Sequence, residues 1–146
     1  MSVCTFFGHR DCYGLDESLL QSKIEELIRQ GVDTFYLGNQ GQFDRMVFGC
    51  LGRLVQVYPH IDFAVVLAYF PTQDAETDPY CGRSIYPEGM EEGPPRFAIE
   101  RRNRWMVNHS DYCLCYITHT QGGAFKFAKY AKQKGLTIIH LGNALL

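Results

Sequence analysis

Five short apolar runs constrain the fold of this chain more than any other feature of its sequence. The runs are rich in β-branched and aromatic residues, and they do not alternate polar with apolar residues. Continuous apolar runs are typical of strands that are covered on both faces, as in a parallel sheet. The predicted strands span residues 3–7, 34–37, 63–70, 112–117 and 137–141.

Helical periodicity fills the intervals between these runs. Apolar residues recur at helical spacing within 15–28 and 47–55, and two further helices are predicted at 98–109 and 122–133. Strands that alternate with helices indicate an α/β fold. Because crossover connections are right-handed, we expect a Rossmann-like open parallel sheet of about five strands in the order 3-2-1-4-5, with helices on both faces.

One segment, residues 71–96, breaks this alternation. It holds most of the prolines and has no apolar period. A loop of this length in a compact domain is usually functional or mobile, so the segment is either a solvated excursion or a lid over a ligand site. The length of 146 residues otherwise fits one domain, and we expect residues 1–146 to form it.

Composition narrows the class of partner. With 46% apolar residues and a formal net charge of −2, the chain has the balance of a soluble domain and no surface suited to coating nucleic acid. No apolar run approaches the ~18 residues that span a bilayer, and the first residues lack the pattern of a secretory signal. We therefore expect a cytoplasmic protein with no nucleic-acid or membrane partner.

The six cysteines do not have the spacing of a metal site. Some lie inside the predicted strands and the others are scattered, and no histidine pair accompanies them at ligand spacing. We interpret them as reduced thiols that act as small buried side chains. Neither a metal nor a cofactor is expected.

Three polar, glycine-containing loops follow predicted strands. In the order 3-2-1-4-5 the chain reverses direction between strands 1 and 4, and ligands of open α/β sheets bind in the crevice at that reversal, outside the carboxyl ends of the strands. The candidate ligand-binding residues are Gly8, His9 and Arg10 after strand 1, Gly38, Asn39, Gln40, Gly41 and Asp44 after strand 2, and Thr118, Gly122 and Gly123 after strand 4.

The chemistry of these loops suits an anion that carries hydroxyl groups. Gly122 and Gly123 open a helix, where backbone N–H groups and the helix dipole favour phosphate, and Arg10 can add a bidentate contact. The polar side chains after strand 2 can bond ribose hydroxyls or a base edge. Simpler explanations stay open for each loop: a tight turn at the glycines, a helix N-cap at Asp44, and packing over a sheet edge at His9.

Four short motifs occur in order along nearly the whole chain. They are Phe6-Phe7-Gly8-His9-Arg10, Gly38-Asn39-Gln40-Gly41-Gln42-Phe43-Asp44, Arg102-Asn103-Arg104-Trp105-Met106-Val107-Asn108-His109-Ser110-Asp111, and Gly122-Gly123 followed by Tyr130-Ala131-Lys132. This set resembles the motifs of the YpsA-like family of the SLOG superfamily. The resemblance implies a Rossmann-like domain that binds nucleotides or their derivatives, and it adds Arg102 and Asn103 to the candidate ligand-binding residues.

The sequence departs from the family pattern in ways that bear on catalysis. Asn39 and Gln40 replace small residues, and Ala124 replaces a threonine, which removes one hydrogen bond to phosphate. The LOG enzymes of the same superfamily cleave the N-glycosidic bond of nucleotides with two glutamates, and Ala128 and Lys129 stand in their places. A lysine opposes the positive charge that develops on the sugar, so the LOG reaction is not expected here.

Three functions remain open from the sequence. The first is a sensor or sequestering domain for a nucleotide or nucleotide-derived small molecule. The second is an N-glycosidase or phosphoribohydrolase in which Asp11, Asp44 or Asp111 supplies the carboxylate and His9 moves a proton. The third is a protein-interaction module with a vestigial pocket. Its surface would use the aromatic residues Tyr80, Tyr86 and Phe97. The oligomeric state is open, a homodimer included.

Arg102 has two possible roles. We predict that Arg102 and the Gly122–Gly123 turn act on the same anionic ligand, because a guanidinium stays charged and forks onto phosphate. The alternative is that Arg102 forms an ion pair with Asp111.

Overall fold

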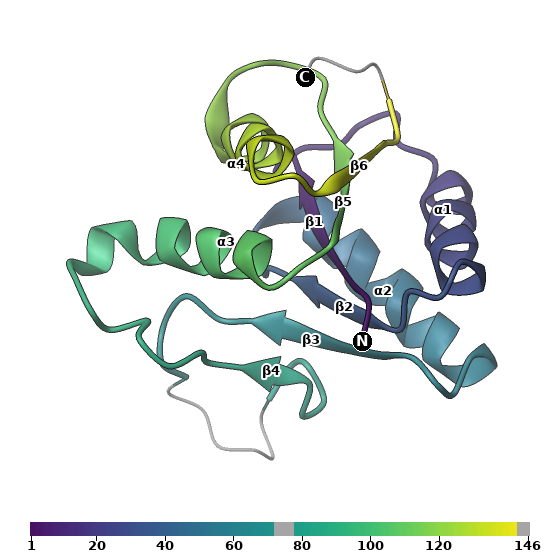
Figure 1. Cartoon of the computed structure of the whole chain (residues 1–146), viewed down its shortest axis with the longest axis horizontal. Helices are drawn as coiled ribbons and strands as arrows, with labels where there is room; N and C mark the ends of the chain where they lie inside the picture. The colour runs from purple at the N-terminus through teal and green to yellow at the C-terminus, as the bar shows by residue number, and fades with distance from the viewer. Residues whose placement is uncertain (72–77, 143–146) are drawn as a thin grey trace.

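The computed structural model describes residues 1–71 and 78–142 as an α/β domain with one parallel sheet. The strand order is β4-β3-β2-β1-β5-β6, and every neighbouring pair is parallel. Figure 1 shows this open sheet with its helices. The strands are β1 (Val3–Gly8), β2 (Thr34–Leu37), β3 (Asp62–Val66), β4 (Ser84–Ile85), β5 (Tyr112–Tyr116) and β6 (Thr137–His140). The predicted Rossmann-like fold is confirmed, and the predicted order corresponds to β3-β2-β1-β5-β6.

Two features of the sheet differ from the prediction: an additional strand, β4, and the end of β3. β4 is an additional edge strand of two residues that pairs with the end of β3, and a strand this short leaves no periodic signal in the sequence. β3 ends at Val66 rather than at Phe70, since Tyr69 and Phe70 are exposed beyond it.

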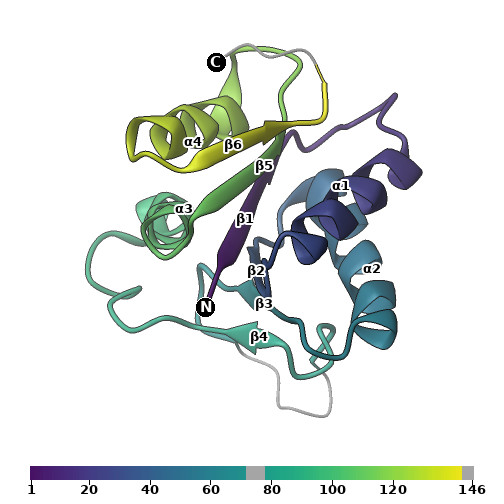
Figure 2. The same cartoon turned by 45° about the vertical axis from the view of Figure 1, so that its right-hand side comes forward.

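Helices cover both faces of the sheet, as predicted (Figure 2). On one face, α1 (Glu17–Arg29) and α2 (Gly41–Val57) pack Leu20, Ile24 and Leu51 into the larger core cluster. On the other face, α3 (Ala98–Asn108) and α4 (Gly122–Gln133) pack Met106 and Phe127 against Phe7 and Cys115. α2 begins six residues before its first predicted apolar position, directly after the loop that follows β2. This early start brings the N-terminus of α2 to the carboxyl edge of the sheet.

The segment that was predicted to be a loop is anchored to the domain at several points, although residues 91–96 are exposed. Asp78 organises a turn, since its carboxylate accepts hydrogen bonds from the N–H groups of Tyr80 at 2.9 Å and Gly82 at 3.0 Å. Met90 is buried with Ala68 in a small core cluster of its own. A 3-10 helix at Pro95–Phe97 then leads into α3. Residues 72–77, which belong to the same predicted loop, lie outside the described residues.

The single tryptophan of the chain, Trp105, lies on α3 and is packed against the core cluster on the α3 and α4 face of the sheet. The indole ring of Trp105 stacks on the imidazole of His109, with ring centroids 4.1 Å apart, and contacts the ring of Tyr36 at 5.1 Å. No helix in the described part of the chain is long and apolar enough to cross a membrane.

Gly8 ends β1 at the point where α2 crosses closest to the sheet. A Cβ atom built on Gly8 overlaps the ring of Phe43, which is fully buried. We expect Gly8→Ala to lower the free energy of unfolding by about 1–3 kcal/mol, because the overlap must be relieved by moving α2. Urea denaturation measures this change. Gly52→Ala in α2 is the matched control: its Cβ meets nothing within 4 Å, and the gain in helix propensity is about 1 kcal/mol. Equal stabilities of the Gly8→Ala and parent proteins would contradict the packing described here.

Candidate functional site

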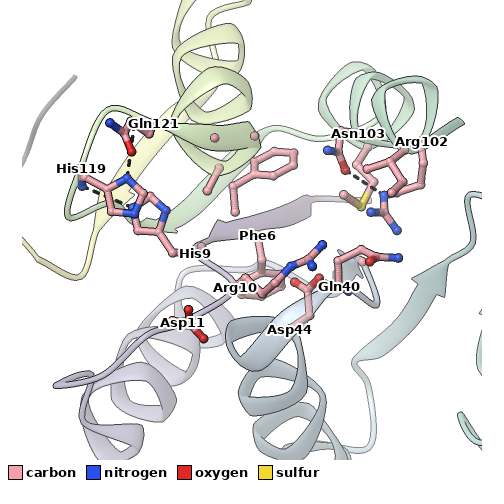
Figure 3. Close-up of a pocket in the computed structure, with 18 residues that line it drawn as sticks. Phe6, His9, Arg10, Asp11, Gln40, Asp44, Arg102, Asn103, His119 and Gln121 are labelled. Atoms are coloured by element: carbon pink, nitrogen blue, oxygen red, sulfur yellow. Dashed lines mark hydrogen bonds between the residues drawn. The ribbon is translucent and has the colours of Figure 1, made fainter. Parts of the chain in front are cut away.

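A pocket of about 500 Å³ opens at the carboxyl ends of β1, β2 and β5. β1 lies between β2 and β5, so this is the point where the strand order reverses. The pocket is lined by Phe6, Phe7, Gly8, His9, Arg10, Asp11, Gly38, Gln40, Asp44, Ile99, Arg102, Asn103, Met106, His119, Gln121, Gly122, Gly123 and Ala124. Figure 3 shows Arg102 and Asn103 at one end of the pocket, His9, His119 and Gln121 at the other, and Arg10 between the two.

The structure brings most of the predicted site residues together in this pocket. Those that line it are Gly8, His9, Arg10, Gly38, Gln40, Asp44, Arg102, Asn103, Gly122 and Gly123. The other three lie just behind its wall. The side-chain oxygen of Asn39 accepts a hydrogen bond from Arg102 at 3.2 Å, and the N–H of Thr118 donates to His9 at 3.0 Å. Gly41 has φ +90 and lets the backbone of Arg10 pass close by.

The apolar wall of the pocket was not predicted. Phe6 and Phe7 come from the end of β1, and Ile99 and Met106 come from α3. Ile99 and Met106 could have been predicted from the sequence, because residues 99, 102, 103 and 106 follow the spacing of one helix face. His119 and Gln121, which were also missed, precede the predicted glycine turn directly.

Arg102 is a buried cation at one end of the pocket. Only 2% of its surface is exposed, and burial lowers the pKa of its guanidinium. Its Nε donates to the side-chain oxygen of Asn103 at 2.8 Å, and its Nη1 donates to the carbonyl oxygen of Val66 at 3.0 Å. The alternative ion pair with Asp111 is wrong: Asp111 accepts a hydrogen bond from the N–H of Val3, which starts β1 at the opposite end of the sheet.

Asp44 faces Arg102 across Gly38. A Cβ atom on Gly38 would lie 3.0 Å from Nη1 of Arg102 and 3.0 Å from Oδ2 of Asp44. The two charged groups form no ion pair within 4.0 Å, so they stand about 4–6 Å apart, close enough to influence one another's charge. Burial raises the pKa of Asp44 to about 6 despite the nearby guanidinium.

Asp44 also stabilises the start of α2. Gln40, not Asp44, is the N-cap residue of this helix, and its side chain makes no capping hydrogen bond. Oδ2 of Asp44 instead reaches back and accepts the N–H of Gln40 at 2.8 Å. One carboxylate oxygen thus stabilises the helix start, and no described residue donates a hydrogen bond to the other.

His9 joins the two loops that border the opposite end of the pocket. Its ring stacks on that of His119 with centroids 3.7 Å apart, and its Nε2 accepts the N–H groups of Thr118 and His119 at 3.0 and 3.4 Å. An acceptor nitrogen carries no proton, so these bonds assign the ring proton to Nδ1. Burial, helped by the charge of His119, lowers the pKa of His9 and favours this neutral form.

The first turn of α4 presents free backbone donors beside His119. Gln121, the N-cap residue, makes no side-chain capping bond, and the first turn holds no acidic residue. Gly122 has φ +86, and a Cβ atom on Gly123 would meet nothing within 4 Å. Open space in front of uncapped N–H groups at a helix N-terminus is an arrangement that accommodates an anion.

Carboxylates are scarce in this pocket. Among the described residues that line it, only Asp11 and Asp44 are acidic. Ala128 is fully buried and Lys129 is exposed on α4, and neither lines the pocket, so the positions of the LOG glutamates do not contribute to it. Asp111, the third carboxylate considered for catalysis, lies at the other end of the sheet.

The aromatic residues that suggested an interaction surface pack largely within the domain. Tyr80 contacts the ring of Phe48 at 5.6 Å, and Tyr86 contacts that of Phe70 at 5.5 Å. Phe97 is 43% exposed. Of residues 71 and 78–96, none lines the 500 Å³ pocket, so the described part of the predicted lid does not cover it.

Comparison with known proteins assigns no function to the pocket. The chain matches no protein-family model, and no curated protein matches it. The resemblance to the YpsA-like family therefore stays a prediction from motifs, and the geometry of the pocket carries the functional argument.

The hydrogen bonds of His9 make one pH dependence of stability testable. The pKa of His9 in the folded protein lies below its ordinary value, so the unfolded chain takes up the proton first as the pH falls. Between about pH 7.5 and pH 5, the free energy of unfolding should therefore fall more steeply in the parent protein than in His9→Gln, whose amide accepts N–H without titrating. Chemical denaturation at both pH values measures the two slopes.

A second histidine serves as the control for this measurement. His60 is exposed and lies away from the pocket, so His60→Gln should keep the slope of the parent protein. Asp44, whose pKa is raised in the folded protein, makes the free energy of unfolding rise as the pH falls. This contribution is the same in all three proteins. Identical slopes for His9→Gln and the parent would show that His9 is not held neutral.

Proposed function

We propose that this chain is a binding domain for a nucleotide or a nucleotide-derived small molecule, acting as a sensor or a sequestering module. One observation carries the proposal: a single pocket at the strand-order reversal combines an uncapped, glycine-containing helix N-terminus with two arginines and hydrogen-bonding side chains from neighbouring loops. Crevices at this position of open α/β sheets are where such folds bind ligands. The resemblance of the four sequence motifs to YpsA-like proteins supports the same assignment.

The phosphate part of such a ligand has a suitable place at α4. The backbone N–H groups of the first turn have no side-chain cap, and a Cβ atom on Gly122 or Gly123 would meet nothing within 4 Å. The helix dipole adds positive potential there. Arg10 is exposed and lines the same pocket, so its guanidinium is available for a charged hydrogen bond (Figure 3).

The nucleoside part of such a ligand matches the size and lining of the pocket. A volume of about 500 Å³ lies within the range of small-molecule sites. Phe6, Phe7, Ile99 and Met106 supply apolar surface for a ring, while Gln40 and Asn103 supply hydrogen-bonding amides. A mixed lining of this kind is typical of pockets that fix both the position and the identity of a ligand.

Thermal-shift measurements test this proposal directly. The panel contains AMP, GMP, CMP, UMP, their di- and triphosphates, NAD and ADP-ribose. We expect at least one compound to raise the melting temperature in a concentration-dependent way, since a ligand that binds only the folded state stabilises it by mass action. Arg10→Ala should weaken binding of that compound by about 1.5–3 kcal/mol through loss of a charged hydrogen bond. Arg104→Ala, an exposed arginine outside the pocket, is the control and should bind like the parent. A folded sample that responds to no nucleotide would refute the proposal.

One observation favours a second candidate function, hydrolysis of an N-glycosidic bond. Asp44 has its pKa raised to about 6 inside the pocket, and perturbed carboxyl groups in clefts are typical of acid–base catalysis. Asp44 would activate the water that attacks the sugar, so that the bond to the base breaks and the base departs with a proton. His9 has only Nδ1 left for moving that proton, because its Nε2 already accepts backbone N–H groups.

Chromatography of nucleoside monophosphates after incubation with the protein separates the two functions. Under the binding proposal the nucleotides remain intact. Release of free base that disappears in Asp44→Asn, with the variant folded, would establish the hydrolase instead. Release that persists in Asp44→Asn but disappears in Asp11→Asn would assign the carboxylate to Asp11, and release that persists in both variants would point to a contaminating activity.

A further inference from the structure

The gap between Arg102 and Asp44 is equipped to bind a neutral group. Nε and Nη1 of Arg102 are hydrogen-bonded, whereas Nη2 has no partner among the described residues. No buried polar side-chain atom in the described structure lacks a hydrogen bond, so Nη2 is open to the pocket that Arg102 lines. Oδ2 of Asp44 is bonded to Gln40, and no described residue donates to its other oxygen. The gap therefore offers N–H donors on one side and a carboxylate acceptor on the other.

A phosphate is the wrong partner for this arrangement. Its oxygens would accept from Arg102 but would face the carboxylate of Asp44 at short range, and like charges repel one another strongly in a partly buried site. A group that carries an acceptor next to a donor satisfies both sides at once. The vicinal hydroxyls of ribose and the hydrogen-bonding edge of a base share this property, and both belong to the nucleoside part of a nucleotide.

The two ends of the pocket are too far apart for one phosphate. Gly38 follows β2 and the Gly122–Gly123 turn follows β5, with β1 between them. Neighbouring strands are spaced ~4.8 Å, which puts the two ends roughly 10 Å apart. A nucleotide is long enough to reach both, and the apolar residues Phe7 and Met106 line the pocket that joins them.

We propose that the ligand lies lengthwise in the pocket, with its phosphate at the N-terminus of α4 and its nucleoside end held between Arg102 and Asp44 over Gly38. This inference depends on the proposed binding function and adds the orientation of the ligand. It also divides the roles that the sequence assigned jointly: the glycine turn meets the anion, and Arg102 meets a neutral polar group.

The sign of a pH effect tests the orientation. The measurement is the affinity of the nucleotide with the largest thermal shift, determined by calorimetry for the parent and for Asp44→Asn. We expect the parent to bind on the order of tenfold more tightly at about pH 8, where Asp44 is ionised and accepts a charged hydrogen bond. The ratio of the two affinities should approach one at about pH 5, below the pKa of about 6 of Asp44.

Other groups near Asp44 also titrate, but they are the same in the parent and in Asp44→Asn. Their effect on affinity therefore cancels in the ratio of the two affinities. The charged and titratable neighbours are Arg10, His9 and Asp11 in the loop after β1, Arg45 on α2, Arg102 on α3, His119 after β5, and Tyr80. Asp62→Asn removes an exposed carboxylate at the other end of β3 and should bind like the parent at every pH. Tighter binding by Asp44→Asn at about pH 8 would place the phosphate beside Arg102 and overturn the orientation. A ratio near one throughout would overturn it as well.

A change at α4 tests the other end without altering Asp44. In Gly123→Asp the new side chain has room, and an acidic residue is favourable at a helix N-terminus, so the variant should fold. It should bind the nucleotide at least tenfold more weakly and leave the affinity for the corresponding nucleoside unchanged. A parallel loss of nucleoside affinity would overturn the orientation, whereas a lack of binding by any nucleotide to the parent would refute the binding function itself.

Deoxynucleotides identify which nucleoside group meets Asp44. If it is the ribose diol, the pH-dependent advantage of the parent over Asp44→Asn should vanish with the 2′,3′-dideoxy form of the same nucleotide. If it is the base edge, the advantage should persist with the dideoxy form and change with the base.

Discussion

The pocket exists because β1 lies between β2 and β5, and the chain adds strands to the sheet first on the β2 side and later on the β5 side. From β1 the chain moves to β2 and β3 through helices on one face, and later to β5 and β6 through helices on the other face. Right-handed crossovers leave no other choice of face. The loops after β1 and β5 must therefore diverge, and the space between them is the pocket. His9 holds these diverging loops together across their gap, because its Nε2 accepts the N–H groups of Thr118 and His119 and its ring stacks on that of His119.

This constraint explains why so much of the fold followed from the sequence. Continuous apolar runs located β1 and β5 because a central strand buried on both faces has no polar alternation to disguise it. They also located β2 and the half-buried edge strand β6. The two misjudged features belong to the β3–β4 side of the sheet. β4 has too few residues to show any period, and Tyr69 and Phe70 extended an apolar run beyond the end of the strand although both side chains face solvent. An apolar run alone does not distinguish a buried strand from exposed aromatic residues that follow it.

The sequence predicted those parts of the site that lie in loops directly after the strands. Loops at the carboxyl edge could be identified without coordinates, whereas contacts between them could not: His9 and His119 stack across more than a hundred residues of chain. The same limit explains why an Arg102–Asp111 ion pair stayed open as the alternative to a ligand contact. The two residues are close in sequence, yet Arg102 lies on α3 at the pocket and Asp111 binds the N–H of Val3 at the start of β1. A buried guanidinium without a carboxylate in direct contact is costly, and this cost is why Arg102 beside Gly38 is central to the proposed ligand contact.

Trp105 gives the domain an optical property that follows from its place on α3. The indole ring lies one helical turn from Arg102 and is wedged between the rings of Tyr36, on the sheet, and His109, on its own helix. Indole emission depends on the polarity and the stacking of its surroundings, and this chain holds a single tryptophan. Any shift of α3 relative to the sheet changes the contact with Tyr36 while leaving that with His109 intact. Intrinsic fluorescence therefore reports the position of the helix that forms one wall of the pocket, with no label attached.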